Sequence, residues 1–290
     1  MEKRIWIYIA AILISVYSLL PIYSLLIISL MDMKDVVTIP GHIYPENMTI
    51  WNFARDFGLE LPGYTRIAGF AFGQAAGLRQ GLMNISLIAP IVMIVTMATT
   101  VPAGYVLGRY RLRFKNLFIG LLLGSRTIPG ISVIIPYYLL FNATGLRGTH
   151  VGVVIVHLTI TIPVITWILM GYFGALPIEL EKAARIDGCG PIDAFRRVVL
   201  PLAFPGIAAC ALLAFLYSWN DYLFSWLIAG GSSAQTYNSM LSAFFIMYAH
   251  HNLFAAAVIV QMIPAMAIAT VLQRYITQLK IVDPVTVVVS

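Results

Sequence analysis

The chain has 290 residues, of which 60% are hydrophobic and only 10% are charged. A soluble domain carries about 25% charged residues because its surface must stay hydrated, so this composition excludes a water-soluble globule and a disordered chain. The net charge of +6 comes from basic residues placed between apolar runs, which is typical of membrane-insertion signals and not of a nucleic-acid-binding face. We therefore expect an all-α, polytopic integral membrane protein, with the lipid bilayer as a partner and no nucleic acid.

Six apolar runs are long enough to cross a bilayer, since about 20 helical residues span a ~30 Å hydrocarbon core. In chain order they are 5–31, 81–108, 116–141, 148–173, 202–229 and 254–275. The first run is about twice as long as the apolar part of a signal peptide, so we expect it to remain as a span. Several runs contain prolines, among them Pro129, which we expect to bend helices without a role in the mechanism.

The basic residues orient these six predicted transmembrane helices. If the N-terminus is cytoplasmic, the inside segments hold twelve Lys and Arg residues and the outside segments hold five. Cytoplasmic loops carry such an excess, and the short connection 109–115 holds its densest cluster. We expect a multi-pass protein of the cell (plasma or inner) membrane with both termini in the cytoplasm.

The connecting segments suggest three regions. Residues 1–80 are expected to form the first transmembrane helix and a long extracytoplasmic loop, in which 32–80 forms short helices or a cap on the membrane surface. Residues 81–278 are expected to form a five-helix core, and 279–290 a cytoplasmic tail. The core contains a polar cytoplasmic loop at 177–201.

This loop is predicted to form two short helices that meet at a glycine corner. Pro177 suits the first turn of a helix, Gly188 and Gly190 end that helix, and Pro191 begins another. Two such helices would make a compact knob that another protein could grip. The alternative is an amphipathic loop that lies on lipid headgroups.

The residue order in the loop favours the knob. Glu181-Lys-Ala-Ala-Arg-Ile-Asp-Gly, followed by Phe195 and by Leu-Pro at 200–201, resembles the EAA loop of ABC importer permeases. Further segments are similar to carbohydrate permeases of the maltose/trehalose type: Asn84-Ile-Ser-Leu, Ala103-Gly-Tyr with Arg109, Ile135-Pro-Tyr-Tyr, Gly145-Leu with Thr149, and Trp219-Asn-Asp-Tyr-Leu-Phe. The resemblance covers most of 81–278.

The resemblance implies a type I ABC importer permease fold and a set of partners. These are a second permease subunit in a heterodimer, two cytosolic ABC ATPase subunits and an extracytoplasmic sugar-binding protein. The implied function is alternating-access import of a mono-, di- or oligosaccharide. The chain lacks a Gly-Lys dipeptide and hence a P-loop, so we expect no enzyme activity and no cofactor in it, with ATP and Mg bound by the partner ATPase.

The resemblance also assigns the coupling loop to contact with the ATPase. The residues assigned to this coupling are Glu181, Lys182, Ala183, Ala184, Asp187, Gly188, Phe195 and Arg196. The family has a second glutamate where this chain has Lys182, so its charge is reversed, and we expect the contact first at Glu181, Ala184, Asp187 and Gly188. A segment that opens with Gly230, Gly231, Ser232 and Ser233 is expected to reach into the binding protein.

Two charges inside the predicted spans need an explanation, because charge in a bilayer is expensive. Arg126 either pairs with Asp221 or with helix-end carbonyls, or lies on the translocation path and donates hydrogen bonds to sugar hydroxyls. Asp221 can also be hydrated at the outer end of its span. The neighbouring residues Trp219, Asn220 and Tyr222 are further candidates for the path, although Trp and Tyr are also typical of membrane interfaces.

The sequence also bears on two alternatives to the importer. An ion-coupled secondary transporter of a small solute should carry several intramembrane carboxylates, whereas the spans contain only the peripheral Asp221. An intramembrane enzyme needs a catalytic pair, and the sequence offers His157 no obvious carboxylate partner. We expect no metal site, because the adjacent His250 and His251 would point apart on a helix and the two cysteines have no ligand spacing.

Overall fold

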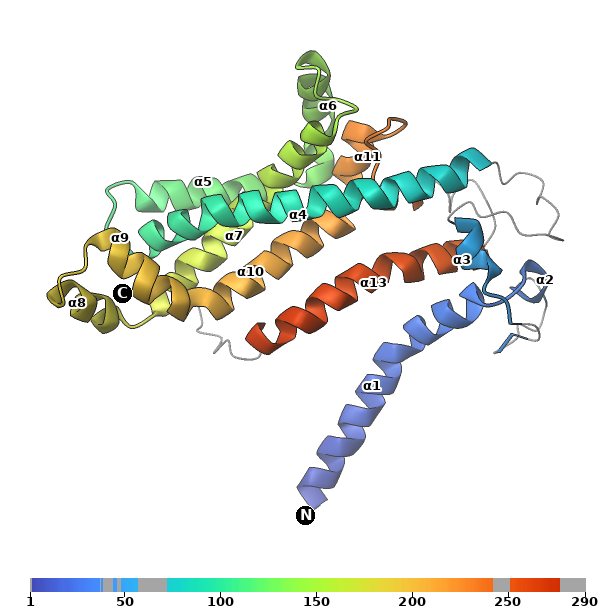
Figure 1. Cartoon of the computed structure of the whole chain (residues 1–290), viewed down its shortest axis with the longest axis horizontal. Coiled ribbons are helices and arrows are strands. Elements are labelled where there is room, and N and C mark those ends of the chain that lie inside the picture. Colours follow the sequence, from blue (N-terminus) through green and yellow to red (C-terminus); the bar gives the residue numbers. More distant parts are fainter. Residues whose placement is uncertain are drawn as a thin grey trace. The chain divides into compact units, whose positions relative to one another are not determined.

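The computed structural model describes residues 2–36, 38, 44–45, 48–56, 72–241 and 251–276. Every element in these ranges is helical (Figure 1), which confirms the all-α prediction. The chain divides into two units, Met1–Met83 with Tyr237–Pro264 and Asn84–Thr236 with Ala265–Ser290. The predicted tail at 279–290, residues 57–71 of the predicted outside segment and His250 lie outside the described residues.

The first unit is built from helices near both ends of the chain. They are α1 (Glu2–Ser29), α2 (Met33–Val36), α3 (Trp51–Asp56), the first part of α4 (Phe72–Arg109) and the first half of α13 (His251–Ile276). α1 and α13 account for the first and sixth predicted spans. The short helices α2 and α3 lie in the segment where the sequence predicts such helices.

Two buried amides hold the end of α1 in the first unit. The Asn52 Nδ2 group donates hydrogen bonds to the carbonyl oxygens of Ser29 and Met31, at 2.8 and 2.9 Å. Asn252 Nδ2 donates to Asn52 Oδ1 at 3.1 Å. Because buried amide groups need such partners, these bonds fix the end of α1 against α3 and the start of α13.

The second unit contains the rest of α4 and a central helix, α7, with its neighbours. Its other elements are α5 (Lys115–Thr127), η1 (Gly130–Val133), α6 (Ile134–Ala143), α7 (His150–Ala175), α8 (Ile178–Ile186), α9 (Pro191–Ala194), η2 (Phe195–Val199), α10 (Leu200–Asn220), α11 (Leu223–Ala229) and the second half of α13. α7 packs against α5, α10 and α11. A buried cluster joins α4, α7, η2 and α10, with the members Tyr105, Ile165, Leu169, Phe173, Val199, Ala203, Cys210 and Ala214.

Glycines let α4 and α7 approach each other closely in this core. A Cβ atom on Gly104 would lie 2.8 Å from Leu169 Cβ, and one on Gly108 would lie 2.7 Å from the carbonyl oxygen of Met170. Small residues at such an interface are the usual means of packing membrane helices. The two helices therefore lie backbone against backbone, with little room to slide.

The third predicted span is not one continuous helix. α5 and the Gly130–Ala143 segment meet at an angle of 92°, and α6 turns away from α5 (Figure 1). The break follows from Pro129, because the residue before a proline is pushed out of the helical region and Ile128 has ψ 120°. In the described ranges five helices are long and apolar enough to cross a membrane, and six if the bent pair counts as one span. The expected bend at Pro129 is present, but it is a break between two helices and not a bend within one helix.

The fifth predicted span is also interrupted. α10 ends at Asn220, Asp221 adopts an extended conformation, and α11 begins at Leu223 as a separate helix. The Asp221 carboxylate accepts a hydrogen bond from the backbone N–H of Ser225 at 2.8 Å. This side-chain bond satisfies a first-turn N–H group of α11, so a new helix starts there.

Candidate functional site

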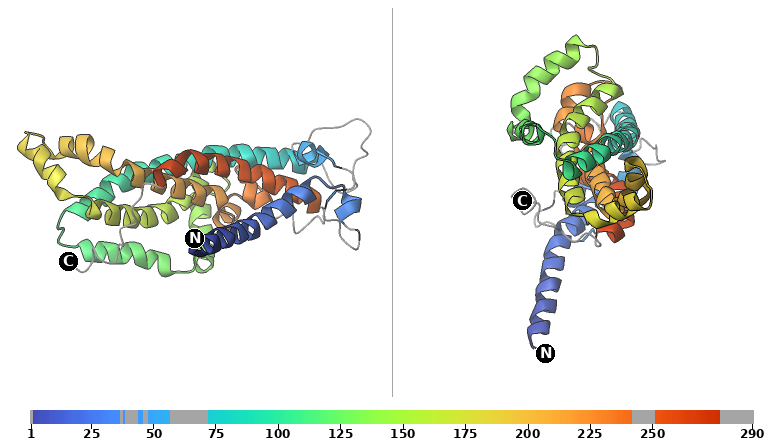
Figure 2. Two further views of the ribbon diagram at one scale, coloured as in Figure 1. Left: turned by 90° about the horizontal axis from the view of Figure 1, so that it is seen from below. Right: turned by 90° about the vertical axis from the view of Figure 1, so that its left-hand side faces the viewer.

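The loop at 177–201 forms the predicted corner between two short helices. α8 ends in a Schellman motif, in which the N–H groups of Gly188 and Cys189 donate to the carbonyls of Arg185 and Ala184 at 3.2 and 3.0 Å. Gly188 has φ +90°, a conformation that favours glycine. α9 then starts with Pro191 in its first turn. Figures 1 and 2 show α8 and α9 beyond the ends of α7 and α10.

The carboxylate of Glu181 points inward from α8 and is buried. Its Oε1 atom accepts hydrogen bonds from the Tyr105 hydroxyl and from Arg185, both at 2.9 Å. Its Oε2 atom lies 3.8 Å from Arg109 Nε, and both side chains are less than a tenth exposed. Tyr105 and Arg109 lie one turn apart on α4, so Glu181 links the loop to the end of that helix.

Further contacts close this cluster around Glu181. Arg109 donates to the Leu176 carbonyl at 2.8 Å, and Arg185 donates to the Tyr110 hydroxyl at 3.2 Å. The hydrogen bond from Arg185 to Tyr110 raises the pKa of Arg185, and the hydrogen bond to Glu181 raises it further. The Phe195 ring lies 4.5 Å from the Tyr105 ring and covers the cluster from η2.

The coupling residues predicted from the sequence therefore fall into two sets. Glu181 and Ala184 are buried and Phe195 is half-buried, whereas Lys182, Ala183, Asp187, Gly188 and Arg196 are exposed. Two large apolar side chains near the corner, Ile186 and Ile192, are 86% and 67% exposed. They were not among the predicted contacts, although an isoleucine beside the glycine corner could have indicated an apolar docking surface.

A second buried polar cluster joins α7, α10 and α11. His157 has no solvent exposure, and its Nδ1 atom lies 2.8 Å from Ser218 Oγ. Its Nε2 atom lies 3.1 Å from Asp221 Oδ2 and 3.0 Å from Ser225 Oγ. The Asp221 side chain is only 7% exposed. The expectations that Asp221 pairs with Arg126 or is simply hydrated, and that His157 lacks a carboxylate, are all wrong.

The other candidates for the substrate path lie in different surroundings. Arg126 is exposed in the last turn of α5 and has no polar partner in the described part of the chain. Trp219 is buried and stacks on Phe215 at 5.4 Å. Asn220 is exposed and donates to the Leu216 carbonyl at 2.9 Å. Tyr222 is exposed.

The turn after α11 is held by hydrogen bonds to a side chain of α4. Asn84 Nδ2 donates to the carbonyls of Ser233 and Gln235, both at 2.8 Å, and Asn84 Oδ1 lies 3.0 Å from His150 Nε2. Gly231, with φ +74°, donates its N–H to Gln235 Oε1 at 3.0 Å. Of the four residues predicted to contact a binding protein, Gly231 and Ser233 are exposed while Gly230 and Ser232 are half-buried.

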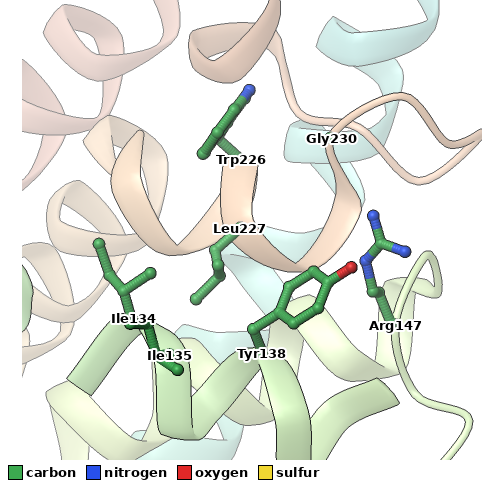
Figure 3. Close-up of a pocket in the computed structure, with 7 residues that line it drawn as sticks. All are labelled: Ile134, Ile135, Tyr138, Arg147, Trp226, Leu227 and Gly230. Carbon is green, nitrogen blue, oxygen red and sulfur yellow. The ribbon is translucent and has the colours of Figure 1, made fainter.

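A groove of about 380 Å³ lies between α6 and α11, and sequence reasoning did not identify it. Figure 3 shows Ile134, Ile135 and Tyr138 on one side and Trp226 and Leu227 on the other, with Arg147 and Gly230 at one end. The Arg147 guanidinium lies 4.8 Å from the centre of the Tyr138 ring. The Tyr138 hydroxyl, the Arg147 guanidinium and the Trp226 indole N–H form no hydrogen bond within the described ranges.

Comparison with known proteins identifies the family. Residues 100–281 match the family model described as binding-protein-dependent transport system inner membrane component. The chain belongs to this family. A trehalose transport system permease protein, SugB of Mycobacterium tuberculosis, is 30% identical over 220 residues, which cover 76% of this chain and 74% of that protein. The trehalose/maltose transport system permease protein MalG of Thermococcus litoralis is 26% identical over 94% of each chain.

A solved structure supports the fold of this permease. A chain of a bacterial ABC transporter involved in the import of the acidic polysaccharide alginate matches with a TM-score of 0.72 at 18% identity, over 95% of this chain and 98% of that chain. Membership of this family makes the permease a membrane-spanning transport subunit, and not a secondary transporter or an intramembrane enzyme. The His157 cluster holds Ser, His and Asp, but its buried position fits a structural role in such a subunit.

Proposed function

We propose that this permease is one subunit of an ATP-driven importer that translocates a sugar by alternating access. Its relatives are named for trehalose, maltose and diacetylchitobiose, which supports a mono-, di- or oligosaccharide. The proposed complex adds a second permease, two cytosolic ABC ATPases that bind ATP and Mg, and an extracytoplasmic sugar-binding protein. Both termini and the α8–α9 corner face the cytoplasm in this proposal, in accord with the excess of basic residues in the predicted inside segments.

The observation that carries the coupling role is the exposed surface of the α8–α9 corner. Ile186 and Ile192 present apolar side chains beside Gly188, and Lys182 and Asp187 surround them with charge. An apolar centre with a polar rim is the usual anatomy of a specific protein interface. The family has a glutamate where this chain has Lys182. A contact at this position would therefore need an acidic group on the ATPase in place of a basic one.

A substitution in this apolar centre tests the docking surface. Replacing Ile186 by Glu should prevent the ATPase from co-purifying with the permease, because a charge would be buried at the interface. Ile178→Glu is the matched control, since Ile178 lies in the first turn of the same helix and is only 41% exposed; it should keep the complex. Equal recovery of the ATPase with both variants would contradict the docking role.

The groove between α6 and α11 is the proposed contact for sugar near the path. Its volume is in the range of small-ligand sites, about 300–1,000 Å³. The faces of Tyr138 and Trp226 suit the apolar C–H faces of a sugar ring, and the Arg147 guanidinium can donate to hydroxyl groups. In this proposal the exposed Arg126, Asn220 and Tyr222 lie along the path, and the turn at 230–233 contacts the binding protein.

The function is tested with the reconstituted complex. ATP hydrolysis is measured with the binding protein and each of trehalose, maltose and diacetylchitobiose. Stimulation by one of these sugars, together with its uptake into vesicles, is the expected result, and stimulation by none of them would contradict the sugar class. Trp226→Ala should raise the sugar concentration needed for half-maximal uptake several-fold, whereas an unchanged value would remove the groove from the path.

A further inference from the structure

We infer that Glu181 is a positioning residue that transmits movement of the coupling loop to α4, and that it is not a contact to the ATPase. This inference rests on the proposed function, since it assumes that a partner moves the loop. It concerns a different step, however. Docking depends on the exposed corner, whereas Glu181 acts between the corner and the membrane helices.

The coupling loop is joined covalently to α7 and α10 but not to α4. The loop continues from α7 through Leu176 and into α10 through η2, so a movement of the loop acts on those two helices along the chain. α4 is separated from the loop by α5, α6 and α7 in sequence. It can follow the loop only through non-covalent contacts, and the described polar ones converge on Glu181, Arg185 and the Leu176 carbonyl.

Because Glu181 is buried, it is unsuitable as a docking contact for the ATPase and suitable as a link between α8 and α4. Only 5% of the residue is exposed, so a partner that grips the corner would not reach its carboxylate. A buried carboxylate is tolerated when it is paired and hydrogen-bonded, and here Tyr105 and Arg109 of α4 supply those partners. Separating α8 from α4 would leave this charge without them, so the two helices are held together.

The link can also tighten. Glu181 Oε2 and Arg109 Nε are both buried and have no hydrogen-bond partner among the described residues. They lie 3.8 Å apart, about 1 Å beyond an ordinary N–H···O bond. A small shift of α8 along α4 would close this gap and form a charge-assisted bond. The cluster would thus gain a second arrangement beside the one in the structure, and a movement of the loop would favour one over the other.

Beyond Tyr105 the contact continues into the rigid core. The Tyr105 ring packs edge-on against Phe173 of α7 at 5.8 Å, and Gly104 and Gly108 hold α4 against the same helix. A displacement delivered to Tyr105 is therefore shared by α4 and α7 and not absorbed by a side chain. Packed interfaces of this kind transmit small shifts because they are not continuously deformable.

The experiment uses the complete transporter with its ATPases and binding protein in liposomes. Glu181→Gln should leave co-purification of the ATPase and basal ATP hydrolysis close to wild type. It should lower both sugar-stimulated hydrolysis and uptake of radiolabelled trehalose or maltose at least tenfold. Asp193→Asn is the matched control, because Asp193 is an exposed acid of the same loop whose pairing with Arg197 is also exposed; it should retain stimulation and uptake.

Two other outcomes would overturn the inference. Loss of co-purification in Glu181→Gln would make this residue a docking contact, and wild-type uptake would make it dispensable. Tyr105→Phe provides a second test if Glu181→Gln does not accumulate, because it removes one hydrogen bond and keeps the charge pair. It should lower uptake several-fold with the ATPase still bound, and an unchanged uptake would contradict a link through Tyr105. If the ATPase fails to bind even the wild-type chain, the proposed function fails instead.

Discussion

Two buried polar clusters of the second unit are suited to different roles because their side chains differ in length and exposure. The Glu181 cluster uses long side chains, and Arg185 within it is 43% exposed. The His157 cluster uses short side chains in the core, with His157, Ser218 and Ser225 fully buried. Long, partly hydrated side chains can adjust when elements move, whereas short buried ones hold one geometry. The first cluster is suited to transmission and the second to fixing a short helix.

The largest effect is expected in the His157 cluster. His157→Ala leaves the Asp221 carboxylate buried with fewer hydrogen-bond partners, which should lower the free energy of unfolding by about 3 kcal/mol or more, since the acceptor is a charged group. The thermal unfolding midpoint of the purified permease measures this loss. His150→Ala is the control, since this half-buried histidine of the same helix makes one side-chain bond, worth about 1 kcal/mol. Equal thermal unfolding midpoints for the two variants would contradict a larger contribution of the core cluster to stability than of the peripheral bond.

A second prediction concerns the packing that connects the two clusters through α4 and α7. Gly108→Ala places a methyl group 2.7 Å from the Met170 carbonyl oxygen, and such overpacking should cost about 1–3 kcal/mol. Uptake should fall with stability, because α4 no longer lies against α7. Gly120→Ala of α5 meets no atom within 4 Å and should raise helix stability slightly. Measured midpoints that do not separate these variants would argue against tight packing of α4.

The smallest effect is expected at the glycine corner. In Gly188→Ala, the alanine must adopt the backbone conformation at φ +90°, which is unfavourable for a residue with a Cβ atom. The conformational free energy of the corner should rise by about 1–2 kcal/mol. Open space surrounds this position, so the strain stays local and the rest of the unit keeps its stability. Binding of the isolated ATPase to the permease should weaken by about tenfold, with Gly188→Asn less affected than Gly188→Ala. A larger loss with Asn would refute a conformational cause.

The structural features that the sequence predicts are those that depend on residues adjacent in the chain. The corner follows from Pro191 and Gly188, whose effects on the backbone reach only a few positions, and the spans follow from the length of apolar runs. The break at Pro129 has the same kind of local signal, namely the constraint that a proline places on Ile128, but this constraint predicts a bend without its size. The interruption at Asp221 depends on a side-chain bond to Ser225, which composition does not reveal.

The two polar clusters could not be predicted from the sequence, because their residues are far apart along the chain. His157 and Asp221 are separated by 64 positions, and opposite formal charge favoured Arg126 as the partner over an uncharged imidazole. Tyr105 and Arg109 could have been grouped, because residues four apart share one face of a helix and both belong to a motif that resembles the permease family. Nothing in the sequence indicates that this face meets Glu181, which lies 76 positions beyond Tyr105.

The amides of Asn52 and Asn252 hold α1 at one end, and none of its 18-residue apolar window is buried inside the described protein. Along most of its length, then, the side chains of α1 are not packed against other described elements of the first unit. A random library of aliphatic replacements over its first five turns should yield many working variants, while the residues around Ser29 and Met31 should tolerate few.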